Sequence, residues 1–214
     1  MEIKNIGGTT GAMDTMDTAD TLKVKETAEK YLYTYKEYAA VDDDNRYELI
    51  DGIAYMMASP SSAHQRISSE LHGRLWQFLR GRTCEVFATL DVRLNADSYD
   101  DTVVQPDILV VCDKSKIDNR GILGAPDLVI EILSRSTATM DFMRKFYLYQ
   151  TSGVKEYWII DPGSKTISVM ILENNEYLRH VYSKKDKIKS VILKGFKLTV
   201  NEIFDNLVIS EEYL

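Results

Sequence analysis

The sequence predicts an α/β protein with a mixed, curved central β-sheet flanked by helices and preceded by an N-terminal helical extension. Three observations support this fold class. Apolar runs typical of buried strands alternate with stretches at helical spacing. Turn signals of the Asp-Gly and Asp-Pro-Gly types separate apolar runs. The length of 214 residues suits one domain with an appendage, and 44% hydrophobic residues suit a packed core.

The chain divides into three parts. Residues 1–33 are predicted to form an N-terminal extension, which is Gly- and Thr-rich and mobile at first and then helical. Apolar residues at three-and-four spacing extend this helical pattern from about Ala19 to Ala40, with a break before Tyr35. Residues 34–207 are expected to form the main domain, and residues 208–214 a C-terminal tail.

The first part of the main domain predicts a hairpin followed by a helix. Asp51-Gly52 joins two apolar runs, 46–50 and 53–57, and is a strong signal for a two-residue turn. Capping residues at 59–62 begin a helix that we expect to end at about Arg80, before Gly81.

The rest of the domain predicts strands around one further helix. We expect strands over 85–94, 103–112, 128–133, 154–160, 165–172, 176–183 and 187–198, a helix over 140–152 and a short helix over 200–207. The nearly continuous apolar runs at 103–112 and 128–133 are typical of central strands covered on both faces.

Composition and motif content exclude several classes of protein. No run approaches ~18 apolar residues, so no membrane span is expected. The N-terminus lacks the pattern of a secretory signal, which predicts a cytoplasmic protein. Cys84 and Cys112 are too few for a disulfide framework, and no Cys/His cluster predicts zinc. A net charge of -7 argues against a broad basic surface. It is compatible with a local basic groove, and with an anionic substrate that is bound partly through a divalent cation.

Two acids stand in the most apolar strands. Asp107 lies within 103–112 and Glu131 within 128–133. An ionised carboxylate in an apolar layer is costly unless it is paired or binds a cation, and neighbouring strands lie ~5 Å apart, so both could meet one metal ion. Two structural alternatives remain: Asp107 caps a strand end beside Pro106, or Glu131 pairs with a buried arginine.

Several motifs, in order, carry a family resemblance. They are Tyr47-Glu48-Leu49-Ile50-Asp51-Gly52, Ser59-Pro60 with His64, Gln105-Pro106-Asp107, Pro126-Asp127-Leu128-Val129-Ile130-Glu131-Ile132-Leu133-Ser134 and Gly153-Val154-Lys155-Glu156-Tyr157-Trp158-Ile159-Ile160-Asp161-Pro162. Over about residues 34 to 205 the chain resembles the "putative restriction endonuclease" family of the PD-(D/E)XK nuclease superfamily. That family is widespread in bacteria and abundant in cyanobacteria.

The resemblance implies a restriction-endonuclease-like core and a metal site. It assigns Asp107 and Glu131 as ligands of Mg²⁺ (or Mn²⁺), and the backbone carbonyl of Ile132 is a further candidate ligand. The superfamily places a lysine two residues after the acid, but that residue here is Leu133. The family's Asp-x-x-x-Lys pattern matches Asp141 and Lys145, so Lys145 is the candidate catalytic lysine. The alternative is an ordinary surface Asp–Lys pair.

Three further residues are candidates for the wall of the site. Glu48 could supply a third carboxylate, or it is an exposed acid before a turn. His64 matches the family at the start of its helix, although a lone histidine there is more often a partly buried structural residue. Gln105 lies on the same side of its strand as Asp107.

These observations predict a metal-dependent nuclease that hydrolyses phosphodiester bonds, with DNA as the expected substrate. Lys145 would orient the attacking water or stabilise charge on phosphorus. One rival is an inactive or weakly active nuclease-fold protein, which Leu133 and the pI of about 5.1 favour. Another is an interaction protein that docks through the tyrosine-rich N-terminal helix. A homodimer suits a nuclease because two strands need two sites.

Overall fold

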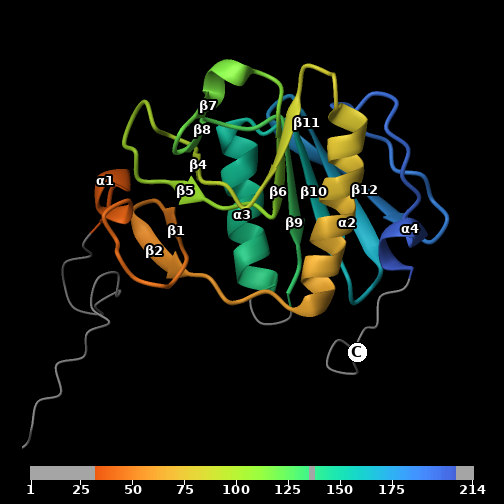
Figure 1. Ribbon diagram of the computed structural model, residues 1–214, viewed down its shortest axis with the longest axis horizontal. Coiled ribbons are helices and arrows are strands. Elements are labelled where there is room, and N and C mark those ends of the chain that lie inside the picture. The colour runs from red at the N-terminus through yellow and green to blue at the C-terminus, as the bar shows by residue number, and fades with distance from the viewer. Residues whose placement is uncertain (1–31, 135–137, 206–214) are drawn as a thin grey trace, which may run out of the picture.

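A computed structural model of the chain describes residues 32–134 and 138–205. A six-stranded sheet lies between α2 and α3, with α4 beside α2 (Figure 1). The helices are α1 (Tyr35–Tyr38), α2 (Ser62–Leu79), α3 (Ala138–Ser152), α4 (Asn201–Phe204) and the 3₁₀ turn η1 (Lys114–Lys116). None of the described helices combines the length and apolar character that a membrane crossing needs.

The larger sheet has the strand order β12-β11-β10-β9-β6-β3. Its strands are β3 (Glu85–Ala88), β6 (Ile108–Val111), β9 (Leu128–Ile132), β10 (Glu156–Asp161), β11 (Thr166–Glu173) and β12 (Glu176–Ser183). Strands β9 and β10 are parallel, and the other neighbours are antiparallel. Successive side chains of a strand point to opposite faces. Accordingly, Ile130 packs in the cluster that contains the apolar face of α2, and Val129 packs in the cluster that contains Tyr149 of α3.

A second, smaller sheet has the order β2-β1-β5-β4-β8-β7. Its strands are β1 (Tyr47–Ile50), β2 (Ile53–Met56), β4 (Val92–Arg93), β5 (Val103–Val104), β7 (Ile117–Asp118) and β8 (Gly121–Leu123). In Figure 1 it lies beside α1, to the left of the larger sheet. The fold is therefore mixed α/β, as the sequence predicts, with its strands divided between two mixed sheets.

Local signals in the sequence locate several elements correctly. Asp51 and Gly52 form the predicted hairpin turn, with φ of 50° and 73°. The side chain of Ser61 caps α2 by accepting a hydrogen bond from the backbone N–H of His64. Helix α3 ends before Gly153, whose φ of 83° suits glycine. The predicted N-terminal helix lies largely outside the described residues, which include only its last turn, α1.

Three predicted strands are wrong. The segments 85–94 and 103–112 are each divided between the two sheets, so that β3 and β6 pair in one sheet and β4 and β5 in the other. Thr89, with φ of 54°, and Pro106, which has no N–H to donate to a ladder, lie at the two breaks. The segment 187–198 is irregular apart from a bridge between Lys187 and Thr199.

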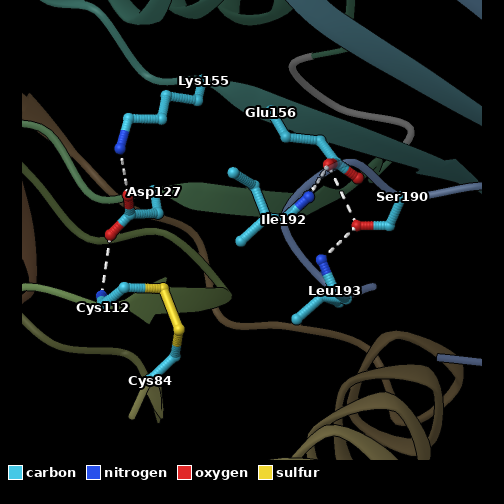
Figure 2. Close-up of a disulfide and its surroundings, with 8 residues drawn as sticks. All are labelled: Cys84, Cys112, Asp127, Lys155, Glu156, Ser190, Ile192 and Leu193. Carbon is cyan, nitrogen blue, oxygen red and sulfur yellow. Dashed lines mark hydrogen bonds and ion pairs between the residues drawn. A yellow bond between two sulfur atoms is a disulfide. The ribbon is translucent and has the colours of Figure 1, made fainter. Parts of the chain in front are cut away.

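A disulfide joins Cys84 and Cys112 (Figure 2). Glu85 pairs with Val111, so the two cysteines face each other one position further along the antiparallel strands β3 and β6. Two cysteines do not form a framework, but this pair cross-links two strands of the larger sheet. Sequence spacing did not reveal the pair because its proximity depends on strand register.

Candidate active site at the junction of the two sheets

The segment Gln105-Pro106-Asp107 carries the chain from β5 in the small sheet to β6 in the large one. The backbone N–H of Gln105 donates to Oε1 of Glu48, 3.0 Å away on β1. Asp107 follows two residues later, immediately before β6 rather than inside a strand as expected. This crossing therefore brings acids from both sheets to one place.

Asp107 and Glu131 lie next to each other across the strands. Ile108 pairs with Ile130 in the antiparallel register of β6 and β9, which places the preceding Asp107 opposite Glu131. The backbone N–H of Ile132 donates to Oδ2 of Asp107 over 2.8 Å. This bond fixes the Asp107 carboxylate against the end of β9.

Lys145 of α3 connects two of the carboxylates. Its Nζ lies 2.9 Å from Oε1 of Glu48 and 3.1 Å from Oε1 of Glu131. Lys145 is 5% exposed, so it is a buried lysine rather than a member of a surface pair. The side chain of Asp141 lies outside the described part of the chain. With Asp107, the site holds three acids against one ammonium group.

His64 lies in the first turn of α2 and contacts Asp107. Its Nε2 is 3.0 Å from Oδ2 of Asp107. Its Nδ1 is buried and has no hydrogen-bond partner among the described residues. A proton on Nε2 therefore satisfies the carboxylate, whereas a proton on Nδ1 would be buried without an acceptor. We assign a proton to Nε2, which donates to Asp107.

Gln105 contributes to the site through its backbone. Its side-chain oxygen accepts from Arg46, with Nη2 at 2.7 Å. Its side-chain nitrogen donates to the Tyr38 hydroxyl at 3.0 Å and to Asp91 at 2.8 Å. These contacts hold the crossing segment against α1 and the small sheet, while the Gln105 N–H holds Glu48.

The protonation of Glu131 reflects its surroundings. Burial raises the pKa of the Glu131 carboxyl to about 8, with the Lys145 ammonium opposing this rise and the Asp107 and Glu48 carboxylates adding to it. Burial also raises the pKa of the Tyr149 hydroxyl well above its ordinary value, and the Glu131 charge adds to this effect. In both groups burial is the largest cause and neighbouring acids add to it, so the uncharged forms of Glu131 and Tyr149 are favoured in the absence of a further cation.

The donor set fits a small divalent cation. Carboxylate and carbonyl oxygens are hard ligands, and Mg²⁺ is usually held by one or two carboxylates while it keeps several waters. Among the described residues, no three His, Cys, Asp or Glu side chains form a ready-made metal cage. Two neighbouring carboxylates, Asp107 and Glu131, meet the need of Mg²⁺ without such a cage.

Tyr149 is a site residue that sequence reasoning did not select. It is fully buried in α3, and its hydroxyl donates to Oε1 of Glu131 over 2.8 Å. It follows Lys145 by four residues and so shares a helix face with it. That spacing was the available signal, but a tyrosine on an apolar helix face is ordinarily part of the core.

The chain is thus a mixed α/β protein with an acidic junction between its two sheets, and comparison with known proteins gives its family. Residues 32–201 match the model of the Uma2 family, described as "Putative restriction endonuclease". The chain belongs to this family, which confirms the resemblance inferred from its motifs.

Two Synechocystis proteins and one solved structure are similar to the chain. The uncharacterized protein slr1290 is 26% identical over 182 residues, which cover 80% of this chain and 91% of that protein. The uncharacterized protein sll1609 is 30% identical over 147 residues, 66% of this chain and 77% of that protein. The crystal structure of a "putative nuclease" of DUF820 from Anabaena variabilis superposes with a TM-score of 0.67 at 20% identity. The match covers 80% of this chain and 97% of that one, and supports the fold.

Proposed function

We propose that the chain is a metal-dependent nuclease that hydrolyses phosphodiester bonds of nucleic acid, with DNA as the expected substrate. The observation that carries this proposal is that Lys145, the one buried lysine or arginine among the described residues, contacts Glu48 and Glu131, while Asp107 lies opposite Glu131. An excess of acids at a buried site is stable when a further cation balances it. Membership of the restriction endonuclease family supports the same reaction class.

In this proposal Asp107 and Glu131 hold Mg²⁺ or Mn²⁺, and the Ile132 carbonyl is available as a further oxygen ligand. When bound, the cation would supply a water of lowered pKa and would offset charge that develops on the phosphate. His64 keeps Asp107 oriented through the bond from Nε2 to Oδ2. Glu48 holds the Lys145 ammonium near the acids.

Lys145 is the proposed catalytic lysine, although it stands on α3 rather than two residues after Glu131. Its Nζ reaches Oε1 of Glu131 across 3.1 Å. The position two residues after Glu131 is occupied by Leu133, which packs with the apolar cluster on the α3 side. In this proposal, helix α3 therefore supplies Glu131 with the ammonium group that the segment after Glu131 lacks.

The test compares purified Asp107→Ala and Glu131→Ala variants with the wild-type chain in nicking of supercoiled DNA with Mn²⁺. Each variant is expected to lose activity by ~10²-fold or more, because each removes a proposed ligand of the cation. Glu173→Ala, which removes an exposed acid at the end of β11, is the matched control. Unchanged cleavage in both site variants would contradict this assignment.

A second candidate function is that of an inactive or weakly active nuclease-fold protein that binds nucleic acid or a partner. Leu133 at the superfamily's lysine position and the net charge of -7 favour it. Calorimetry separates the two: no heat of Mn²⁺ binding to the wild-type chain would favour the inactive form.

We further propose a cytoplasmic homodimer, since paired sites would allow cleavage of both strands of a duplex. Light scattering of the full chain measures its mass. Comparison with a chain lacking residues 1–31 tests whether the N-terminal extension carries the contact.

A further inference from the structure

The two oxygens of Glu131 have different surroundings. Oε1 accepts from the Tyr149 hydroxyl over 2.8 Å and lies 3.1 Å from Nζ of Lys145. Among the residues that the structure describes, no group donates to Oε2. The fully buried side-chain atom without a partner in the described part of the chain is His64 Nδ1. Oε2 of Glu131 is therefore not fully buried, and the side chain of Glu131 is 12% exposed.

Tyr149 is held rigidly in this position. It is fully buried in α3, one helical turn beyond Lys145. Its ring packs edge-on against Tyr157 of β10, with centroids 5.0 Å apart. A ring fixed in this way keeps its hydroxyl at one point, so the hydrogen bond also fixes the rotation of the Glu131 carboxylate.

Asp107 shows the same division of its oxygens. Oδ2 takes both the bond from His64 Nε2 and the bond from the Ile132 N–H. Among the described residues, one oxygen of each acid thus accepts from two donors, and the other has no donor and is available for a ligand. Partners that orient a ligating carboxylate typically contribute 10–100-fold to metal affinity.

We propose that Tyr149 is a positioning residue that turns Oε2 of Glu131 outward, so that a cation binds this carboxylate through one oxygen only. This inference rests on the proposed metal-dependent function, and it adds a statement about which cations the site prefers. Binding through single oxygens suits Mg²⁺ and Mn²⁺, whereas Ca²⁺ takes six to eight oxygens and often uses both of a carboxylate. The site therefore discriminates against Ca²⁺.

The test is calorimetric titration of metal-free wild-type chain and Tyr149→Phe with Mn²⁺ alone and, separately, with Ca²⁺ alone. Loss of the hydroxyl frees Glu131 to rotate, so Mn²⁺ affinity is expected to fall ~10-fold or more. Ca²⁺ affinity should fall less or rise, so the ratio of Mn²⁺ affinity to Ca²⁺ affinity should decrease. A merely structural tyrosine would leave this ratio unchanged.

Tyr177→Phe is the matched control. The Tyr177 hydroxyl is also largely buried and donates to the backbone carbonyl of Val154 over 2.8 Å. Its loss removes one hydrogen bond without touching the acids. Mn²⁺ affinity is expected to stay within about twofold of wild type. An equal loss of Mn²⁺ affinity in both variants would overturn the role of Tyr149.

The outcomes separate the two proposals. If wild-type chain binds no Mn²⁺, the proposed metal site fails, and the role of Tyr149 fails with it. If wild-type chain binds Mn²⁺ and Tyr149→Phe binds it equally well, only the positioning role is overturned.

A second measurement avoids any folding defect of the variant. A 3-fluorotyrosine at position 149 keeps the hydroxyl and reports on its hydrogen bond through the ¹⁹F resonance. Titration with Mg²⁺ should shift this resonance with the midpoint found by calorimetry. A resonance that does not respond while Mg²⁺ binds would overturn the inference.

Discussion

Two buried glutamates on neighbouring strands, Glu131 of β9 and Glu156 of β10, have different surroundings. Glu156 is fully buried, and both of its oxygens are satisfied. Oε1 accepts from Trp158 Nε1 at 2.6 Å, and Oε2 accepts from the Ser190 hydroxyl and from the N–H groups of Val191 and Ile192. Figure 2 shows this loop folded around the Glu156 carboxylate.

In the part of the chain that the structure describes, Glu131 has donors on one oxygen only, and one of them is the charged Lys145. The comparison teaches that an acid in an apolar strand does not by itself identify a metal site. What distinguishes the two glutamates is whether neutral donors saturate both oxygens. By this criterion Glu156 anchors the irregular segment 188–193, whereas Glu131 retains an oxygen for a ligand.

The largest effect on stability is expected from Glu156→Ala. The substitution leaves Trp158 Nε1 and the N–H groups of Val191 and Ile192 buried without their acceptor. Each orphaned donor costs about 1–3 kcal/mol, so the free energy of unfolding should fall by about 3–5 kcal/mol in urea denaturation. Mn²⁺ affinity should be unchanged, because this carboxylate does not contribute to the site.

Glu156→Gln sharpens the comparison. Its amide oxygen can still accept from the loop, and only the Trp158 bond is lost, so the expected destabilisation is about 1–2 kcal/mol. Glu131→Gln should instead abolish Mn²⁺ binding. If Glu156→Gln also abolished it, the distinction between the two glutamates would be wrong.

Reduction of the disulfide is the next largest expected effect. Cys84 and Cys112 are 28 residues apart in sequence, and closing a loop of this size destabilises the unfolded chain by about 3.5 kcal/mol. Urea denaturation of oxidised and reduced chain measures the difference, and a Cys84→Ala/Cys112→Ala variant controls for effects of the reductant. If the reduced chain no longer binds Mn²⁺, the region of the disulfide and the candidate metal site are coupled.

Cation binding should depend on pH through Glu131. The pKa of its carboxyl is about 8 in the folded chain against 4.5 ordinarily. The cation needs the ionised acid, so Mn²⁺ affinity should rise by up to about tenfold per pH unit as pH approaches 8, and then level off. Calorimetry from pH 6 to 9 measures this rise, and a flat profile would contradict it.

The same shift sets the sign of the pH effect on metal-free stability. A raised folded pKa means that the folded state binds a proton that the unfolded state has released. Glu131 therefore contributes stability at low pH that is lost as pH rises from about 4.5 to about 8. The difference in unfolding free energy between wild type and Glu131→Gln, measured across this pH range, should show this loss.

The smallest effect is expected from Lys155→Met. Lys155 Nζ lies 2.6 Å from Oδ1 of Asp127, but its side chain is 65% exposed. An ion pair with so exposed a partner contributes less than about 1 kcal/mol. Asp127 also accepts the Cys112 N–H at 2.7 Å and keeps this bond in the variant (Figure 2). A loss above 2 kcal/mol in urea denaturation would show that the pair matters more than its exposure indicates.

Local patterns in the sequence predicted much of this molecule. Helix periodicity and capping located α2 and α3, and Asp51-Gly52 located the first hairpin. The buried-acid argument and the family resemblance selected Asp107, Glu131 and Lys145, which the structure brings into one region. These signals are short-range, or they depend on the chemistry of one side chain.

The features that the sequence did not predict depend on long-range packing. The apolar patterns of 85–94 and 103–112 continued through Thr89 and Pro106, so they did not show that the chain passes from one sheet to the other at these residues. The Cys84–Cys112 bond depends on register, and the role of Tyr149 depends on how α3 docks. The carboxylate of Glu156 escaped notice because its donors come from a segment expected to be a strand.

The crossing at Gln105-Pro106-Asp107 has a consequence for the order of assembly. Glu48 lies on β1 of the small sheet and Glu131 on β9 of the large sheet, and Lys145 lies on α3, which follows these two strands in the chain. A nascent or truncated chain that ends before α3 has the acids without their counter-charge. If the proposed nuclease function holds, cleavage would require a chain that has been made and folded at least through α3, so shorter fragments would leave nucleic acid intact.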